Sequence, residues 1–176
     1  DSVKQHARMI RNELGRIRAD IKWVEYENYH LTVKFLGEVD EGKLPAVKEA
    51  LARSAQAVPE FNLSAAGIGF FPGKNSPRVI WLGIRGEVDK ARFLGERVDT
   101  YLQELGFPQE KSHRFHLTLG RFRSDVRKNE VVEKSEIINQ KPKITAFHVP
   151  HFYLMQSILS AAGPKYHIVE KYTLEG

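Results

Sequence analysis

Hydrophobic positions that recur every three or four residues predict amphipathic helices, and alternating or short continuous apolar runs predict strands. The expected helices cover residues 2–20, 44–55, 88–105 and, with a weaker pattern, 126–138. The expected strands cover residues 22–25, 29–37, 61–71, 78–84, 115–122, 143–149, 152–159 and 166–172. Helices and strands are mixed, the connections are short, and no Ser/Gly/Pro linker interrupts them. The pattern predicts one α+β domain with two lobes.

One short pattern occurs twice within the expected strands. Residues 29–33 read Tyr-His-Leu-Thr-Val, and residues 115–119 read Phe-His-Leu-Thr-Leu. The two histidines are 86 positions apart, about half of the 176-residue chain, and each copy follows a predicted helix. This repeat indicates a duplicated half and a pseudo-two-fold axis that brings the copies together.

The repeated residue types suit acid–base chemistry. Because side chains alternate along a strand, His30 and Thr32 share a face, and His116 and Thr118 do so too. Two imidazoles with pKa values near 6.5 can be one protonated and one neutral, as concerted proton transfer requires. The threonine hydroxyls can donate hydrogen bonds to a developing oxyanion. A single His-x-Thr arises easily by chance, but its repetition in matched context favours an active site.

Composition narrows the function further. Apolar residues make up 41% of the chain and charged residues 28%, as in ordinary globular proteins. The chain has no cysteine, which excludes disulfide scaffolds, cysteine-ligated zinc, iron–sulfur clusters and a thiol nucleophile. The formal net charge is +5, and residues 111–128 alone hold six basic side chains against one acidic side chain. This surplus predicts an anionic partner, and beside the second histidine it indicates a phosphate.

Other features predict no metal, cofactor or membrane. Two pairs of histidines three positions apart, His113 with His116 and His148 with His151, lack a carboxylate that would complete a ligand set. No apolar run reaches the length of a membrane span and no signal peptide is evident, so we expect a cytoplasmic protein. Three aromatic residues could stack on a base, although core packing is the favoured interpretation for each: Phe35, Trp81 and Tyr153.

Several segments together carry a resemblance to a known family. They are residues 30–37 (His-Leu-Thr-Val-Lys-Phe-Leu-Gly), 116–121 (His-Leu-Thr-Leu-Gly-Arg), 69–72, 77–81 and 163–166. With them the chain resembles the two-histidine (2H) phosphoesterases, and most closely the RNA 2′,3′-cyclic phosphodiesterases, also called 2′-5′ RNA ligases. The resemblance spans nearly the whole chain. One departure is that the family opens with a short apolar strand, whereas this sequence starts at Asp1, almost directly in the first helix.

The resemblance implies a fold and a reaction. The fold is a single domain over residues 1–176, with two intertwined, pseudo-symmetric lobes and one His-x-Thr motif in each. Antiparallel sheets frame a central cleft and helices lie outside. The reaction is hydrolysis of a terminal 2′,3′-cyclic phosphate of RNA to a 2′-phosphomonoester, without a cofactor. Ligation would be the same chemistry reversed, with a 5′ hydroxyl in place of water.

The resemblance also implies roles for the motif residues. His30 corresponds to the proton donor that serves the 3′ oxygen as it leaves. His116 corresponds to the proton acceptor that activates water. Thr32 and Thr118 would hold phosphate oxygens.

Two basic residues are candidates for substrate binding. Arg121 matches an arginine that family members direct at the phosphate. Strict alternation places it on the face opposite His116, so this role requires a bulge or a strand end after Gly120. Lys34 shares the parity of His30, and it could either reach the phosphate or remain a solvated lysine at the rim.

Two alternatives remain open from the sequence. One is a phosphodiesterase that acts on small cyclic nucleotides or ADP-ribose cyclic phosphate. The other is a non-catalytic RNA- or nucleotide-binding module of the same fold, although both motifs are complete, which favours an enzyme. The basic residues favour RNA ends as the substrate. We expect a monomer.

Overall fold

The computed structural model describes all 176 residues, which divide into two compact units. Unit 1 comprises Asp1–Leu31, Leu63–Gly86 and Phe115–Phe147, and unit 2 comprises Thr32–Asn62, Glu87–Arg114 and His148–Gly176. The helices are α1 (Ser2–Gly15), α2 (Leu44–Ala55), α3 (Val88–Gln103) and α4 (Lys128–Gln140), with short 3₁₀ turns η1 (Tyr26–Asn28) and η2 (Glu41–Lys43). The strands are β1 (Ile21–Trp23), β2 (Phe61–Phe71), β3 (Val79–Gly86), β4 (His116–Phe122), β5 (Thr145–Val149), β6 (His151–Ser160) and β7 (Gly163–Thr173).

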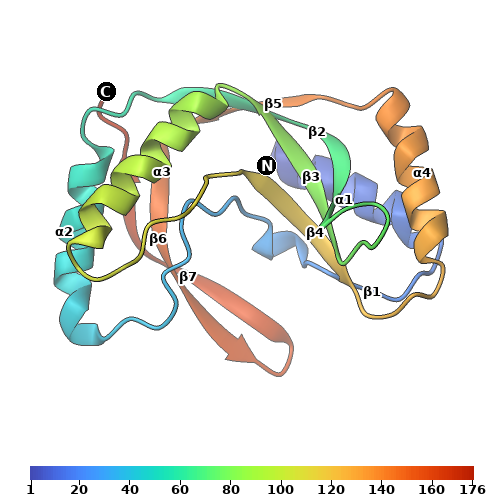
Figure 1. Cartoon of the computed structure of the whole chain (residues 1–176), viewed down its shortest axis with the longest axis horizontal. Helices are drawn as coiled ribbons and strands as arrows, with labels where there is room; N and C mark the ends of the chain where they lie inside the picture. Colours follow the sequence, from blue (N-terminus) through green and yellow to red (C-terminus); the bar gives the residue numbers. More distant parts are fainter. The chain divides into compact units, whose positions relative to one another are not determined.

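Unit 1 is built on a five-stranded sheet in the order β1-β4-β3-β2-β5 (Figure 1). Helices α1 and α4 pack against it and against each other. The apolar spacing of α1 delivers Ala7, Ile10 and Leu14 to a core that continues through Ile80 and Leu119. The sheet therefore has one face buried under helices.

Helix α1 is shorter than the sequence pattern predicts, because it ends at Gly15 rather than near residue 20. Arg18 adopts a positive φ of 60°, which a continuing right-handed helix does not allow. The chain turns there and enters β1 at Ile21. Apolar periodicity thus continued past the point where the backbone leaves the helix.

Strand β4 contains a bulge. Its residues pair regularly with β3 from His116 to Thr118 and again from Gly120 to Arg121. Thr118 lies opposite Trp81 and Gly120 opposite Ile80, so Leu119 is one extra residue in β4. One extra residue reverses the alternation of side chains beyond it.

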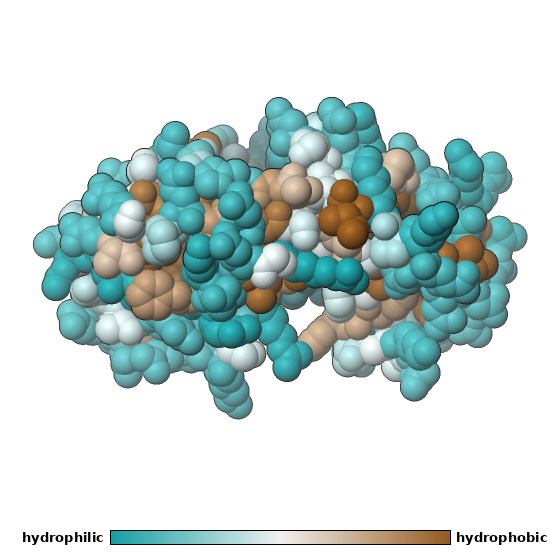
Figure 2. Space-filling model, turned by 90° about the horizontal axis from the view of Figure 1, so that it is seen from above, coloured by the Kyte–Doolittle hydropathy of each residue, from teal (hydrophilic) through white to brown (hydrophobic).

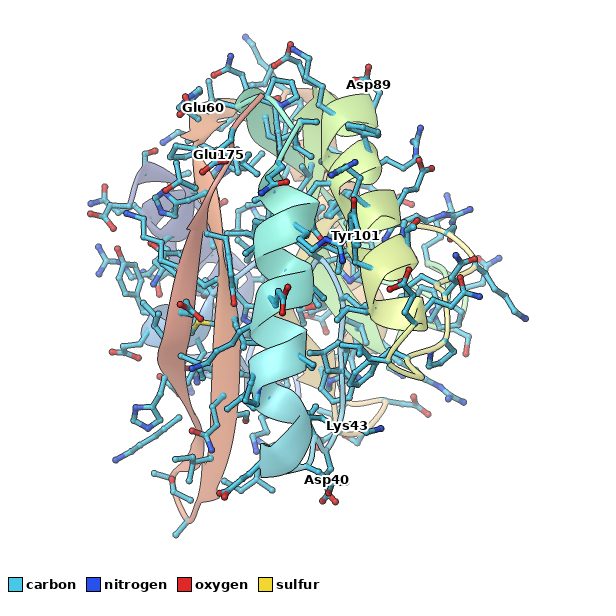
Figure 3. All side chains as sticks on the ribbon, turned by 90° about the vertical axis from the view of Figure 1, so that its left-hand side faces the viewer. Asp40, Lys43, Glu60, Asp89, Tyr101 and Glu175 are labelled. Atoms are coloured by element: carbon cyan, nitrogen blue, oxygen red, sulfur yellow. The ribbon has the colours of Figure 1, made fainter.

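Unit 2 consists of the helix pair α2 and α3 and the antiparallel ribbon β6–β7. Figure 3 shows α2 between the ribbon and α3, with Tyr101 of α3 on the side that faces α2. The guanidinium of Arg53 lies 4.8 Å from the Tyr101 ring centroid. Its larger buried apolar residues include Val47, Leu51, Leu94, Val98, Leu102, Phe152 and Tyr172. The unit therefore has its own core.

The mixed α and antiparallel β architecture confirms the predicted fold class, and strand β2 coincides with its predicted range. The predicted strand over residues 29–37 is wrong: these residues form no strand. Their apolar alternation was sufficient for the prediction, but a strand also needs a hydrogen-bonded neighbour. Phe35, expected in the core, is 80% exposed.

One face of the molecule is mostly hydrophilic. Figure 2 shows polar side chains over most of the visible face, with separate hydrophobic groups among them. None of the helices has both the length and the apolar character needed to cross a membrane.

Candidate active site

The second His-x-Thr motif lies in β4, inside the sheet of unit 1. His116 lies opposite Gly83 of β3, and Thr118 lies opposite Trp81. Leu117, between them, is buried on the helix-covered face, while His116 is exposed and Thr118 half-buried. The imidazole and the hydroxyl therefore share the open face of the strand, as alternation predicts.

Trp81 packs beside His116, with ring centroids 6.0 Å apart and an interplanar angle of 45°. The indole lies across Gly69 of β2, where an added Cβ would come within 2.1 Å of it. The missing side chain of Gly69 thus makes room for Trp81. Although His116 reaches solvent, burial by the surrounding protein disfavours its imidazolium form and lowers its pKa. A lowered pKa keeps His116 neutral near pH 7, as a proton acceptor must be.

Arg121 comes to the same face as His116 because of the bulge at Leu119. Leu119 and Gly120 are both buried, and Arg121 after them is exposed. A place for Arg121 beside His116 requires a break in alternation, predicted after Gly120, and the extra residue Leu119 supplies it one residue earlier. Gly120 is needed at this point, since an added Cβ would lie 2.9 Å from the Ile21 side chain and 3.0 Å from the Lys22 carbonyl oxygen.

The first motif follows the 3₁₀ turn η1 rather than lying in a strand. The exposed His30 ring turns back on this segment, and its Nδ1 donates to the carbonyl oxygen of Asn28 at 2.6 Å. A carbonyl oxygen can only accept, so Nδ1 carries the proton. Nε2 is then the atom that gains or loses a proton, which makes it the one that can act on a substrate.

Lys34 is neither solvated at the rim nor free to reach a phosphate, as the alternation of side chains had predicted. Its side chain is only 4% exposed, and its ammonium donates to Asp99 Oδ1 and, at 2.6 Å, to the carbonyl oxygen of Pro108. Because residues 29–37 are not a strand, sharing parity with His30 does not imply sharing a face. Thr32, by contrast, is exposed. The ammonium of Lys34 is therefore used within the protein.

The candidate site residues are distributed over both units. His30, His116, Thr118 and Arg121 belong to unit 1, and Thr32 begins a segment of unit 2. The boundary between the units thus falls within the first motif, between Leu31 and Thr32. The expected placement of one complete motif in each lobe remains a prediction. No three histidine, aspartate or glutamate side chains lie together as metal ligands would.

Comparison with known proteins identifies the family. The family model described as LigT like Phosphoesterase matches residues 1–81 and 83–166, nearly the whole chain. The chain belongs to this family. The resemblance seen in the repeated motifs is thereby confirmed.

Curated relatives align over most of their length. A protein of Archaeoglobus fulgidus named RNA 2′,3′-cyclic phosphodiesterase is 38% identical over 168 residues, which cover 94% of this chain and 90% of that protein. A Thermotoga maritima protein of the same name is 35% identical over 176 residues, covering 100% of this chain and 91% of that protein.

Solved structures agree with the fold. The Thermus thermophilus protein TT0787 superposes with a TM-score of 0.75 at 26% identity, covering 97% of this chain and 92% of that one. LigT of E. coli without ligand superposes with a TM-score of 0.77 at 22% identity, covering 100% of this chain and 92% of that one. The fold is thus shared with proteins of low sequence identity.

Two residues of the network around Lys34, Asp99 and His113, were not predicted from the sequence. Asp99 was not singled out, although it falls next to the inward positions Val98 and Leu102 of α3, where a carboxylate needs a partner. His113 was expected to have no special role, yet it donates to Asp99. A charged residue on the apolar stripe of a helix was the signal available.

Proposed function

We propose that this chain hydrolyses terminal 2′,3′-cyclic phosphates of RNA by acid–base catalysis between His30 and His116. Neutral His116 accepts a proton from water, which attacks phosphorus. Protonated His30 gives its proton from Nε2 to the 3′ oxygen as the P–O3′ bond breaks. The product is an RNA end with a 2′-phosphomonoester and a free 3′ hydroxyl.

One observation carries the assignment of roles: burial lowers the pKa of His116, whereas a carbonyl oxygen holds the proton on Nδ1 of His30. A general acid must be protonated and a general base must be neutral, and two imidazoles can meet these requirements at one pH when their surroundings differ. The names of the curated relatives support the substrate. Both histidines belong to unit 1, which supports their acting together.

The remaining motif residues complete the proposal. Thr32 and Thr118 donate hydrogen bonds to the non-bridging phosphate oxygens, and Arg121 pairs with their charge. The bulge at Leu119 supports this role for Arg121, since it brings the guanidinium to the face of His116. No metal ion takes part in the proposed step, because the two imidazoles supply both proton transfers.

The test is to incubate the protein with an oligonucleotide that ends in a 2′,3′-cyclic phosphate, in buffer treated with a chelator. We expect ³¹P NMR to show the cyclic ester replaced by a 2′-phosphomonoester at an undiminished rate. Activity that vanishes on chelation and returns with added metal would contradict the mechanism. Mononucleoside cyclic phosphates serve as the comparison. A higher kcat/KM for them than for the oligonucleotide would show that small cyclic nucleotides, not RNA ends, are the preferred substrates.

A further inference from the structure

A buried polar cluster of unit 2 joins the two segments that carry the motifs. Lys34 and Asp99 have side chains 4% and 5% exposed, and the His113 side chain is 5% exposed. Lys34 is two residues after Thr32, and His113 is three residues before His116. The cluster therefore ties down the chain on the unit 2 side of both motifs.

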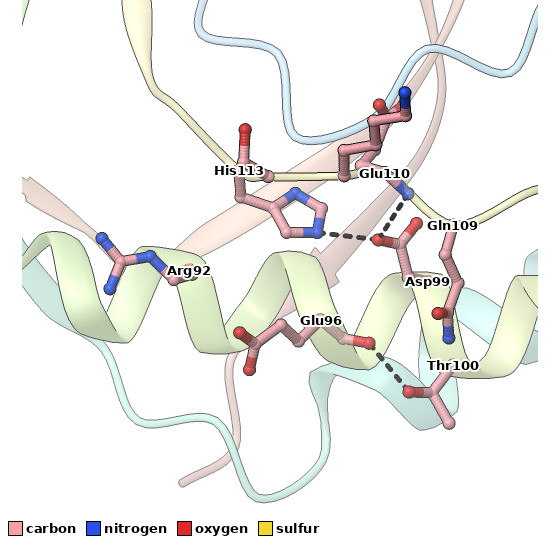
Figure 4. A pocket seen from close by; sticks show the side chains of 9 residues that line it. Arg92, Glu96, Asp99, Thr100, Gln109, Glu110 and His113 are labelled. Carbon is pink, nitrogen blue, oxygen red and sulfur yellow. Dashed lines mark hydrogen bonds and ion pairs between the residues drawn. The ribbon is translucent and has the colours of Figure 1, made fainter.

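The Asp99 carboxylate, on α3, is shared by three donors. Oδ1 accepts from the Lys34 ammonium. Oδ2 accepts from His113 Nε2 at 2.7 Å and from the Glu110 backbone N–H at 3.1 Å, and Figure 4 shows these two contacts. Burial opposes ionisation of Asp99, but the hydrogen bonds from Lys34, the Glu110 N–H and His113 outweigh it and lower the pKa. The carboxylate is thus ionised and fully engaged.

The helix itself is shaped to receive the His113 ring. One turn before Asp99 stands Gly95, and an added Cβ there would lie 2.6 Å from Nδ1 of His113 and 2.7 Å from its Cγ. Glycine in the middle of a helix destabilises it relative to alanine. Gly95 therefore lowers the stability of the helix but leaves room for the His113 ring to reach the Asp99 carboxylate.

The segment 107–114 is held at both ends by the same cluster. Lys34 also donates to the Pro108 carbonyl oxygen at 2.6 Å and lies 4.0 Å from the Glu110 carboxylate. His113 closes the other end of the segment on Asp99. Arg92 and Glu96 of α3 line the pocket of about 310 Å³ over this cluster (Figure 4).

We propose that Lys34, Asp99 and His113 form a positioning clamp that sets the backbone of both His-x-Thr motifs for catalysis. The first motif is not part of a β-sheet, so the contacts of Lys34 hold residues 32–34 in place of the backbone hydrogen bonds that a neighbouring strand would make. At the second motif, the clamp fixes the path by which the chain enters β4. This role rests on the proposed function, and it replaces phosphate binding as the role of Lys34.

The test compares kcat and KM of Lys34→Met, Asp99→Asn and Gly95→Ala with those of Arg97→Met. Arg97 is a matched control on the same helix, since it donates to the Ser54 and Arg53 carbonyl oxygens of α2 at 3.0 and 2.9 Å. Assays are run at a temperature where circular dichroism shows each variant fully folded. We expect kcat to fall about 10- to 100-fold in the three clamp variants, with a smaller change in KM, and to stay near wild type in Arg97→Met.

Two substitutions of His113 distinguish loss of its hydrogen bond from loss of its side-chain volume. His113→Gln keeps an N–H donor and should retain most of kcat, whereas His113→Leu should lose it. Gly95→Ala adds a single methyl and should fold even where Lys34→Met does not. Clamp variants that melt at lower temperature yet keep wild-type kcat when folded would overturn the proposal.

Amide hydrogen exchange tests the clamp independently of any substrate. In Lys34→Met and Gly95→Ala we expect at least tenfold faster exchange in residues 32–36 and 107–114, with β2 and α4 unchanged. This result would stand even if the cyclic phosphate were not the substrate, so the two proposals can fail separately. Unchanged exchange in both segments would refute the clamp.

Discussion

The two His-x-Thr motifs share a sequence pattern but are held by different physical means. Residues 116–118 lie in β4 and pair with β3, where backbone hydrogen bonds hold the chain whatever the side chains are. Residues 30–32 lie in no strand, and the contacts nearby come from side chains: His30 on Asn28 and Lys34 on Asp99. A ladder tolerates substitutions beside it, whereas side-chain contacts are lost with a single residue.

The largest effect we expect is loss of either histidine. His30→Ala and His116→Ala should each lower kcat/KM by about 10²–10⁴, because each removes one proton transfer. Steady-state kinetics on the cyclic-phosphate oligonucleotide measures this. His148→Ala is the matched control, since that exposed imidazole pairs with Glu60 at 2.6 Å and belongs to neither motif. Near-normal turnover in either motif variant would refute the paired mechanism.

Loss of a phosphate-holding residue should cost less. We expect Thr32→Ala, Thr118→Ala and Arg121→Ala to lower kcat by roughly 10²–10³. Arg121→Lys should recover only part, because lysine lacks the planar guanidinium fork. Arg123→Ala provides the control, since Arg123 is exposed and pairs with Asp20 at 3.3 Å. Equal activity of Arg121→Ala and Arg123→Ala would show that the bulge has no role in catalysis.

Stability variants sharpen the contrast between the motifs. Gly69→Ala should destabilise the protein by about 1–3 kcal/mol, because the added methyl must displace Trp81 beside His116. Gly37→Ala, after the first motif, has open space around it and should cost about 1–2 kcal/mol through its φ of +73° alone. Urea unfolding measures both. Of the two, only Gly69→Ala should alter the pH dependence of activity, and an unaltered profile would separate Trp81 from the site.

The smallest expected effect is a shift in the acid limb of the pH–rate profile. Because the pKa of His116 is lowered from 6.5, it stays neutral, and the enzyme active, to a lower pH than a free imidazole would allow. In Trp81→Leu, His116 is less buried, its pKa rises towards 6.5, and the acid limb moves to higher pH. The limbs belong to the coupled pair of histidines. A limb that moves to lower pH would contradict burial as the cause.

Much of the second motif could be predicted from the sequence. Period-2 alternation placed His116 and Thr118 on one face, and the misfit of Arg121 required a break in register, which the extra residue Leu119 supplies. The repeat itself identified all four motif residues. These inferences depend only on local geometry, which a sequence carries.

The surroundings of the first motif could not be predicted. An alternating apolar pattern shows that a segment is extended, but not that another strand lies beside it. Residues 29–37 were therefore predicted to be a strand, although they pair with no other strand. The partners of Asp99 are 65 and 14 residues away, at Lys34 and His113. Contacts of that separation arise from tertiary packing, and no local pattern encodes them.

The most direct test of the account is a double-mutant cycle on the two histidines, with single-turnover rates on the cyclic-phosphate oligonucleotide. If His30 and His116 act as one acid–base unit, the double variant His30→Ala/His116→Ala should be little slower than the slower single variant. Each single variant already loses the concerted step, so the second substitution has little left to remove. Multiplicative losses, with the double variant slower by the product of both factors, would contradict the paired mechanism.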